Sequence, residues 1–296
     1  MFPHAQTIIS PIVENVICFT STVYSYYPQI IFNAARYLWP MQKSAAEKNA
    51  GKLSLLQLIS LADIVTILNG LFGMASMFSV MLQRFDLAVT FMLLASLADG
   101  IDGIVARLVK SECRLGEYLD GFSDMTSFCI APSVLIFGKF YGSDAFASSI
   151  GITAGNLFVT ATIGFLLVLG MLRLARFEYS DGGSNRKIFL GLPTLAVELW
   201  VCATVALDLH WAFVLPPVVV MSAAMVSSRL KWPKVKGWIA YAFAIPIVLT
   251  ILFGTRFYLF APWSLIVAAG AYILLGPPYV YLKEKNATAA QTPSFR

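Results

Sequence analysis

Residues 97–128, with the sequence LADGIDGIVARLVKSECRLGEYLDGFSDMTSF, place acidic side chains inside apolar sequence. An acidic residue near the centre of a bilayer costs roughly 2.5–3.5 kcal/mol on insertion scales. The four aspartates of this stretch fall in helical sequence and therefore predict a compensating partner, for which a divalent cation is the natural choice. The acidic residues are Asp99, Asp102, Glu112, Glu117, Asp120 and Asp124.

The spacing of the aspartates places each pair on one face of a helix. Residues three or four apart are neighbours on a helix surface, so Asp99 lies beside Asp102, and Asp120 beside Asp124. A tight connection between two antiparallel helices would bring the pairs face to face. Carboxylates this close cannot all stay ionised without cations. Hard oxygen ligands favour Mg²⁺ or Mn²⁺, and two ions about 4 Å apart would hold a phosphoryl group for in-line displacement.

Small residues and one arginine accompany the aspartates. Gly103 and Gly116 would let a backbone or a ligand approach closely, and Ala106 is small in the same sense. Arg107 lies about one turn beyond Asp102 and could meet a phosphate. Spacing alone leaves two other interpretations open. The acids could line the path of a cation transporter, or they could form a solvated network of ion pairs with Arg107, Lys110 and Arg114.

The chain as a whole has the composition of a polytopic membrane protein. Of its 296 residues 58% are hydrophobic and 12% charged, and the mean hydropathy is +0.74. A spanning helix needs about 20 mostly apolar residues, so we predict an all-α membrane bundle of about eight transmembrane helices. The predicted spans are 60–82, 86–109, 117–140, 150–177, 191–208, 210–226, 236–254 and 259–282.

Basic residues set the predicted orientation, because Lys and Arg accumulate in short cytoplasmic loops. In this arrangement all but three of the 21 Lys and Arg residues fall on one side. The exceptions are Arg84, Lys139 and Arg256. Both termini and the acidic stretch are therefore predicted to be cytoplasmic. The net charge of +5 follows from this asymmetry, and we do not interpret it as nucleic-acid binding.

The predicted organisation has four parts. An N-terminal interfacial segment and polar linker occupy 1–57, the core 58–236, two additional transmembrane helices 237–283, and a polar, disordered tail 284–296. The N-terminus lacks the features of a secretory signal. The four cysteines show no paired spacing, and we expect neither disulfides nor a zinc site.

The acidic stretch resembles the signature of the CDP-alcohol phosphotransferase family. Its run Asp99-x-x-Asp102-Gly103-x-x-Ala106-Arg107, followed after eight residues by Gly116-x-x-x-Asp120-x-x-x-Asp124, matches every fixed position of that signature. The resemblance implies that the four aspartates bind two Mg²⁺ or Mn²⁺ ions and that Asp124 is also the catalytic residue, which takes the proton of the attacking alcohol. It further implies nucleotide contacts from Gly103, Ala106, Arg107 and Gly116.

Other stretches resemble the serine-using branch, that of phosphatidylserine and archaetidylserine synthases. LADIVTILNGLFG (61–73) is similar to the first-helix motif of the family, with Thr66 and Asn69 among the nucleotide-binding positions, but it has Ala62-Asp63 where Pro-Asn is common. LRLARF (172–177), FLGLPT (189–194) and WPKVK (232–236) resemble three further landmarks. Arg173 and Arg176 would meet the serine carboxylate or a lipid phosphate, or they would serve as ordinary topology anchors.

We therefore expect a CDP-diacylglycerol or CDP-archaeol serine O-phosphatidyltransferase of phospholipid biosynthesis. It would be a multi-pass protein of the cell membrane, with its active site facing the cytoplasm. Its partners would be a CDP-linked lipid, L-serine and membrane lipids. Because dimers are common in the family that it resembles, we also expect a homodimer. Glycerol 3-phosphate or inositol phosphate as the acceptor, or a divalent-cation transporter, are the competing interpretations.

Overall fold

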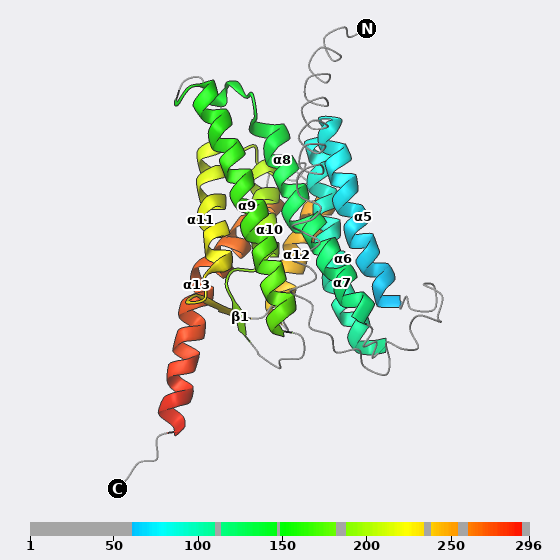
Figure 1. Cartoon of the computed structure of the whole chain (residues 1–296), viewed down its shortest axis with the longest axis vertical. Helices are drawn as coiled ribbons and strands as arrows, with labels where there is room; N and C mark the ends of the chain where they lie inside the picture. The colour runs from blue at the N-terminus through cyan, green and yellow to red at the C-terminus, as the bar shows by residue number, and fades with distance from the viewer. Residues whose placement is uncertain are drawn as a thin grey trace, which may run out of the picture. The chain divides into compact units, whose positions relative to one another are not determined.

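The computed structural model describes residues 61–109, 114–146, 149–181, 188–233, 238–253 and 260–291. In this part of the chain, consecutive long helices run in alternating directions and pack as a bundle (Figure 1). The helices are α5 (Leu61–Met81), α6 (Phe85–Val109), α7 (Arg114–Asp124), η1 (Met125–Ile130), α8 (Ala131–Phe140), α9 (Ile152–Asp181), α10 (Thr194–Ala206), α11 (Leu215–Val226), α12 (Trp238–Phe253) and α13 (Phe260–Gln291). The short helices η2 (Asp144–Phe146) and η3 (Trp211–Phe213) lie in connections.

Each of the eight predicted apolar segments contains a helix, but the described helices differ in length. Five are long and apolar enough to cross a membrane: Ala62–Met81, Phe85–Val105, Tyr118–Phe140, Ile152–Phe177 and Phe260–Lys283. The three shorter apolar helices are Thr194–Ala206, Trp211–Val226 and Ala242–Leu252. A helix of 13 residues, such as α10, rises only about 20 Å, which is less than a hydrocarbon core of about 30 Å. The structure thus supports a multi-pass membrane protein with five candidate spans.

The third predicted span is not one regular helix. A π-helical segment, η1, separates α7 from α8, and Asp124 is its N-cap. The backbone N–H of Ala131 donates to the carbonyl of Thr126, five residues earlier, which is the π pattern. Single π turns inside α-helices occur frequently at functional sites. This wider turn starts directly after Asp124, the last of the aspartates that were predicted to bind metal.

A two-stranded ribbon departs from the predicted all-α fold. β1 (Ile188–Leu190) pairs antiparallel with β2 (Lys231–Pro233), and Phe189 lies opposite Trp232. These strands belong to the FLGLPT and WPKVK stretches. Two landmarks more than 40 residues apart in sequence are therefore neighbours in space, and they join the connections that precede α10 and α12.

Trp232 of this ribbon fixes α13. Pro277 has no N–H to donate within α13, so the carbonyl of Ile273, four residues earlier, loses its helical partner. The indole N–H of Trp232 donates to that carbonyl at 3.3 Å. Gly276 makes room for the ring, because a Cβ there would lie 2.3 Å from Trp232 Cδ1. The hydroxyl of Tyr272 donates to the carbonyl of Pro233 at 2.9 Å. These contacts join the last helix to the core.

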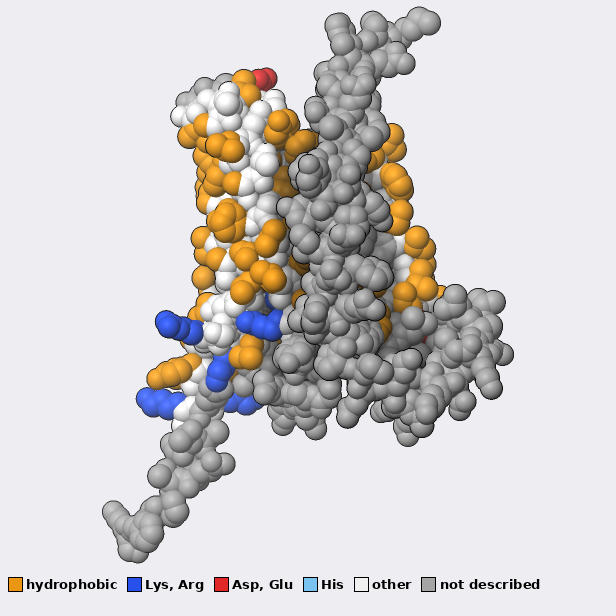
Figure 2. All heavy atoms as spheres, in the orientation of Figure 1, with side chains coloured by type: hydrophobic (Ala, Val, Ile, Leu, Met, Phe, Trp, Pro, Cys, Tyr) orange, Lys and Arg blue, Asp and Glu red, His pale blue; other side chains and the backbone are white. Residues whose placement is uncertain are grey.

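The end of α13 corrects the prediction of a disordered tail at 284–296. The helix continues as far as Gln291, and residues 292–296 lie outside the described part, as does the predicted interfacial segment 1–57. Figure 2 shows Lys and Arg side chains gathered near the lower end of this face, where α13 emerges, and apolar side chains over the surface above them. This distribution agrees with the charge asymmetry read from the sequence.

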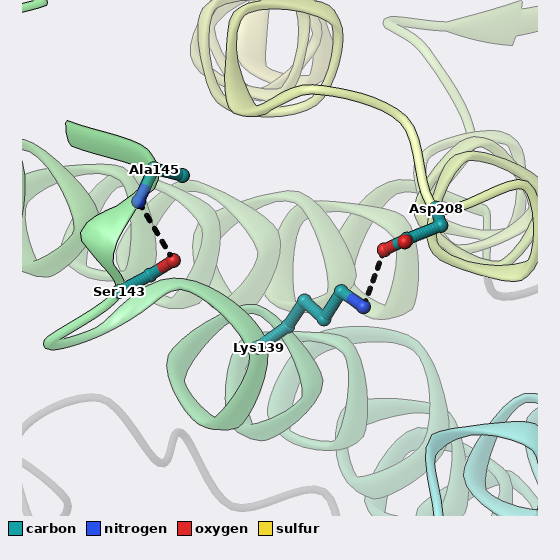
Figure 3. A network of polar contacts seen from close by, with 4 residues as sticks. All are labelled: Lys139, Ser143, Ala145 and Asp208. Carbon is teal, nitrogen blue, oxygen red and sulfur yellow. Dashed lines mark hydrogen bonds and ion pairs between the residues drawn. The ribbon is translucent and has the colours of Figure 1, made fainter. Parts of the chain in front are cut away.

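The other end of the bundle has its own polar contacts. Lys139, at the end of α8, forms an ion pair with Asp208 in the turn after α10, with Nζ and Oδ1 2.5 Å apart (Figure 3). The hydroxyl of Ser143 accepts from the backbone N–H of Ala145 at 3.2 Å. Lys139 was predicted on the side opposite the acidic stretch. An exposed pair of this kind contributes about 1 kcal/mol at most.

Close packing of α5 against η1 depends on Gly73. A Cβ at this position would lie 2.6 Å from Ser127 Oγ and 3.0 Å from Ser127 Cα. Small residues let membrane helices approach this closely. The short distance between α5 and η1 lets the hydroxyl of Ser127 donate to the carbonyl of Asn69 at 2.9 Å. Gly73 therefore controls the distance between the helix that carries Thr66 and Asn69 and the span that carries Asp120 and Asp124.

We predict that Gly73→Ala destabilises the protein by about 1–3 kcal/mol, the usual cost of overpacking a closely packed site. Thermal unfolding of the detergent-solubilised protein measures the loss. Gly164→Ala is the matched control, because a Cβ at Gly164 meets no atom within 4 Å and alanine favours a helix. An unchanged midpoint for Gly73→Ala would contradict the described packing.

Candidate metal centre

Three of the four predicted metal ligands come together in the structure. One carboxylate oxygen from each of Asp99, Asp120 and Asp124 lies within 4.8 Å of the other two. Asp99 belongs to α6. Asp120 and Asp124 belong to α7, the next helix in the sequence. The two helices therefore bring one aspartate of the first predicted pair together with both aspartates of the second. All three side chains are half-buried.

Asp102, the fourth predicted ligand, is held by a neighbouring helix. The hydroxyl of Thr66 on α5 donates to Asp102 Oδ2 at 2.8 Å. Asp102 is close enough to both Asp99 and Asp120 to interact with them electrostatically. It borders the cluster of three, and Thr66 fixes the orientation of its carboxylate.

Asp124 is oriented in a similar way. The side-chain amide of Asn69, also on α5, donates to Asp124 Oδ1 at 3.2 Å. The hydroxyl of Ser127 in turn donates to the backbone carbonyl of Asn69. Thr66 and Asn69 were predicted to contact a nucleotide, and the structure shows both of them holding aspartates. Their positions three residues apart place them on one face of α5.

The chemistry of the cluster fits a divalent metal ion. Its donors are all hard carboxylate oxygens, which Mg²⁺ and Mn²⁺ prefer. Among the described residues, none of the three clustered aspartates forms an ion pair with Lys or Arg. The buried Oδ1 of Asn69 also has no hydrogen-bond partner. Carboxylates gathered in a mostly apolar surrounding are costly, and a bound metal would reduce that cost.

The small residues of the signature have different surroundings. A Cβ added to Gly103 would meet no atom within 4 Å, so this position faces open space. A Cβ added to Gly116 would lie 2.6 Å from Asp63 Oδ1, and close packing of α7 on α5 accounts for this glycine. Ala106 and Arg107 belong to α6, but their side chains lie outside the described part of the structure.

The two arginines of LRLARF have different environments. Arg176 Nη1 donates to the carbonyl of Val226 at 2.9 Å, and Nη2 to that of Leu190 at 2.6 Å. It thereby caps the C-terminal end of α11 and joins it to β1. Carbonyl groups at this end of a helix lack intrahelical donors, so Arg176 has a structural role.

Arg173 is buried and directed toward the cluster. It is 8% exposed, and it is close enough to Asp99 and Asp124 to interact with both electrostatically. Among the described residues it donates one long hydrogen bond of 3.5 Å, from Nη1 to Thr194 Oγ1. The rings of Phe177 and Phe189 lie 5.4 and 5.8 Å from its Cζ. Arg173 thus combines a buried positive charge with weak hydrogen bonding.

Sequence reasoning missed two buried polar residues near this site. Ser127 lies three residues after Asp124 and links η1 to α5. Glu198 is fully buried in α10 and interacts electrostatically with Asp99. A glutamate inside the apolar run TLAVELWVCATVA is itself a signal of function. Nothing in the sequence indicates that it lies close to α6.

Comparisons with known proteins identify a family model and several similar enzymes. The family model for CDP-alcohol phosphatidyltransferase matches residues 59–275. A CDP-diacylglycerol–serine O-phosphatidyltransferase from Helicobacter pylori is 29% identical over 214 residues, which cover 69% of this chain and 84% of the relative. One from Methanocaldococcus jannaschii is 30% identical over 200 residues, covering 67% and 87%. The archaetidylserine synthase of Methanothermobacter thermautotrophicus is 30% identical over 184 residues, covering 60% and 72%.

We predict that the purified protein binds Mn²⁺ and that Asp120→Asn weakens this binding by more than about 10-fold, since even a residue that only supports a metal ligand is worth that much. Loss of the electron paramagnetic resonance signal of free Mn²⁺ measures the affinity. Asp86→Asn, an exposed acid in the first turn of α6, is the control and should bind normally. Equal affinities for all three proteins would contradict the assignment.

Proposed function

The chain belongs to the CDP-alcohol phosphatidyltransferase family, and from this premise we propose that it transfers a phosphatidyl or archaetidyl group from a CDP-linked lipid to the hydroxyl of L-serine. CMP is the second product, and the reaction belongs to phospholipid biosynthesis. The convergence of Asp99, Asp120 and Asp124 within 4.8 Å carries the proposal. The names of the three relatives support serine as the acceptor.

Two Mg²⁺ or Mn²⁺ ions would be held by Asp99, Asp102, Asp120 and Asp124. When bound, such ions neutralise a diphosphate and stabilise the negative charge that develops on departing CMP. The contribution of the protein is to fix the carboxylates beforehand. Thr66 and Asn69 do this from α5 through their contacts with Asp102 and Asp124.

Asp124 is the proposed catalytic residue. Its Oδ1 accepts from Asn69, which fixes the orientation of the carboxylate. That carboxylate would orient the serine hydroxyl and receive its proton. The serine oxygen then forms a bond to the lipid-bearing phosphorus, and the bond from that phosphorus to the CMP oxygen breaks. A carboxylate that also binds metal is a weak base, so orientation of the hydroxyl is a large part of this role.

The nucleotide would bind along the signature. We assign contacts to Gly103, Ala106, Arg107 and Gly116, with Thr66 and Asn69 lining the same side. Gly103 supports this assignment, because no protein atom occupies the space that its missing side chain leaves. A backbone without Cβ atoms lets a ligand approach closely.

Arg173 is the proposed partner of the serine carboxylate. Its long hydrogen bond to Thr194 leaves most of its five N–H donors for a ligand, and a planar guanidinium suits a carboxylate. A lipid phosphate is the other ligand with the same chemistry. Arg176 donates to backbone carbonyls instead, and we propose a structural role for it.

We place the active site at the cytoplasmic face of the cell membrane. The distribution of basic residues supports this orientation, with about eight membrane segments and both termini in the cytoplasm. Five of those segments are long enough to span by themselves, and the three shorter ones would complete the bundle. A homodimer is also part of the proposal, by analogy with the family.

We predict that the purified protein with Mn²⁺ and a CDP-lipid releases CMP when L-serine is present. Chromatographic measurement of CMP, with CDP-diacylglycerol and CDP-archaeol tested separately, also identifies the lipid. EDTA should abolish the reaction, and added Mn²⁺ should restore it. Release only with glycerol 3-phosphate or inositol phosphate would contradict serine as the acceptor, and no release with any acceptor would favour a cation transporter.

We predict that Arg173→Gln raises the KM for serine roughly 10- to 100-fold, because a hydrogen bond to a charged group contributes about 1.5–3 kcal/mol. The KM for the CDP-lipid should change little. Arg176→Gln is the matched comparison, and it should lower the unfolding temperature more than it changes either KM. If Arg173→Gln raises the KM of the lipid instead, the arginine binds a lipid phosphate.

A further inference from the structure

Glu198 is a fully buried acid that the proposed reaction does not use. It lies in the middle of α10, with 0% of its surface exposed. Its Oε2 is 2.9 Å from Ser96 Oγ on α6, and its Oε1 is 3.2 Å from Cys202 Sγ on its own helix. No Lys or Arg among the described residues forms an ion pair with it. A buried carboxylate without a cation is strongly disfavoured.

Ser96 lies near two acceptors but has one proton to donate. Ser96 Oγ is within hydrogen-bonding distance of both the carbonyl of Met92, at 3.2 Å, and Glu198 Oε2. A hydroxyl has one proton to donate, so an ionised Glu198 would compete with the carbonyl for it. If Glu198 is protonated, it can donate to Ser96, which leaves the proton of Ser96 for the carbonyl of Met92. In that form the proton of Glu198 and the proton of Ser96 each have their own acceptor. The thiol of Cys202 donates to Oε1 of Glu198.

The link from Glu198 reaches α6 beside the metal cluster. Ser96, Asp99 and Asp102 follow one another at intervals of three residues, so each points about 60° away from the one before it. Ser96 connects one side of α6 to α10, and Asp102 connects another side of α6 to α5. Asp99 lies between these two sides. Glu198 is also close enough to Asp99 to interact with it electrostatically.

We propose that Glu198, in its protonated form, is a positioning residue that holds α6 through Ser96 and thereby keeps Asp99 in place to bind metal. The inference rests on the proposed function in so far as it treats Asp99 as a metal ligand. Glu198 itself touches neither metal nor substrate in this proposal. Its contribution is the neutral hydrogen-bonded connection between α10 and α6.

Two variants of Glu198 distinguish hydrogen bonding from charge. Glu198→Gln keeps a donor and an acceptor of the same size, and it should bind Mn²⁺ with close to wild-type affinity. Glu198→Leu keeps the volume without the hydrogen bonds, and it should weaken Mn²⁺ binding by about 10-fold or more, as loss of the support of a metal ligand does. Mn²⁺ titration followed by electron paramagnetic resonance, with the unfolding midpoint measured in parallel, gives both affinities.

A third variant tests the link from the side of α6. Ser96→Ala removes the partner of Glu198 and should also weaken Mn²⁺ binding. Combined with Glu198→Leu it should cause little additional loss, since both changes break one connection. Should Glu198→Leu fail to fold, Ser96→Ala and Glu198→Gln still give the comparison.

Infrared spectroscopy tests the protonated form without any metal. The difference spectrum between wild type and Glu198→Gln should contain the carbonyl band of a protonated carboxyl group. A carboxylate band in its place, or a loss of Mn²⁺ binding in Glu198→Gln as large as in Glu198→Leu, would overturn the proposal. So would wild-type affinity in both Glu198→Leu and Ser96→Ala. If the wild type itself binds no Mn²⁺, the proposed function fails, and the infrared result separately decides whether Glu198 is neutral.

Discussion

The structure depends on one constraint: carboxylates are gathered in a protein whose surroundings are mostly apolar. Each aspartate of the cluster needs both a cation and a rigid support, because mutual repulsion would otherwise push the helices apart. The neighbouring helices supply the support with short polar side chains. Thr66 and Asn69 act from α5, and Gly73 lets that helix approach closely enough for both contacts. The packing of the bundle and the geometry of the site thus have the same cause.

Much of this arrangement follows from patterns in the sequence. Every predicted apolar segment contains a helix, and Asp99, Asp120 and Asp124 meet as their spacing predicts. These predictions succeed because helix periodicity and bilayer thickness are general constraints. The family, and the serine-using relatives to which the later motifs point, were also recognisable from residues alone. The assignment of individual residues to nucleotide and acceptor stays a prediction.

Other features depend on contacts that periodicity does not encode. The ribbon joins FLGLPT to WPKVK, and pairing between segments so far apart has no local signal. Arg173 and Arg176 look equivalent in sequence, but tertiary contacts give one a buried position near the aspartates and the other a set of carbonyl partners. Glu198 is conspicuous in an apolar helix, yet only the packing of α10 on α6 shows which residue it meets. The prediction of disorder was wrong for residues 284–291, because α13 continues to Gln291.

The π turn after Asp124 affects how this span can tolerate inserted or deleted residues. In an α-helix each residue turns the chain by about 100°, so an inserted or deleted residue rotates everything on one side of it. A π turn absorbs one additional residue locally. The π turn therefore lies between two parts of the span. One part carries Asp120 and Asp124, and the other packs through Phe128 and Leu135. The rotation of one part about the helix axis does not fix the rotation of the other. A change in the packing of α8 can therefore be absorbed in residues 125–130 without rotating Asp120 and Asp124.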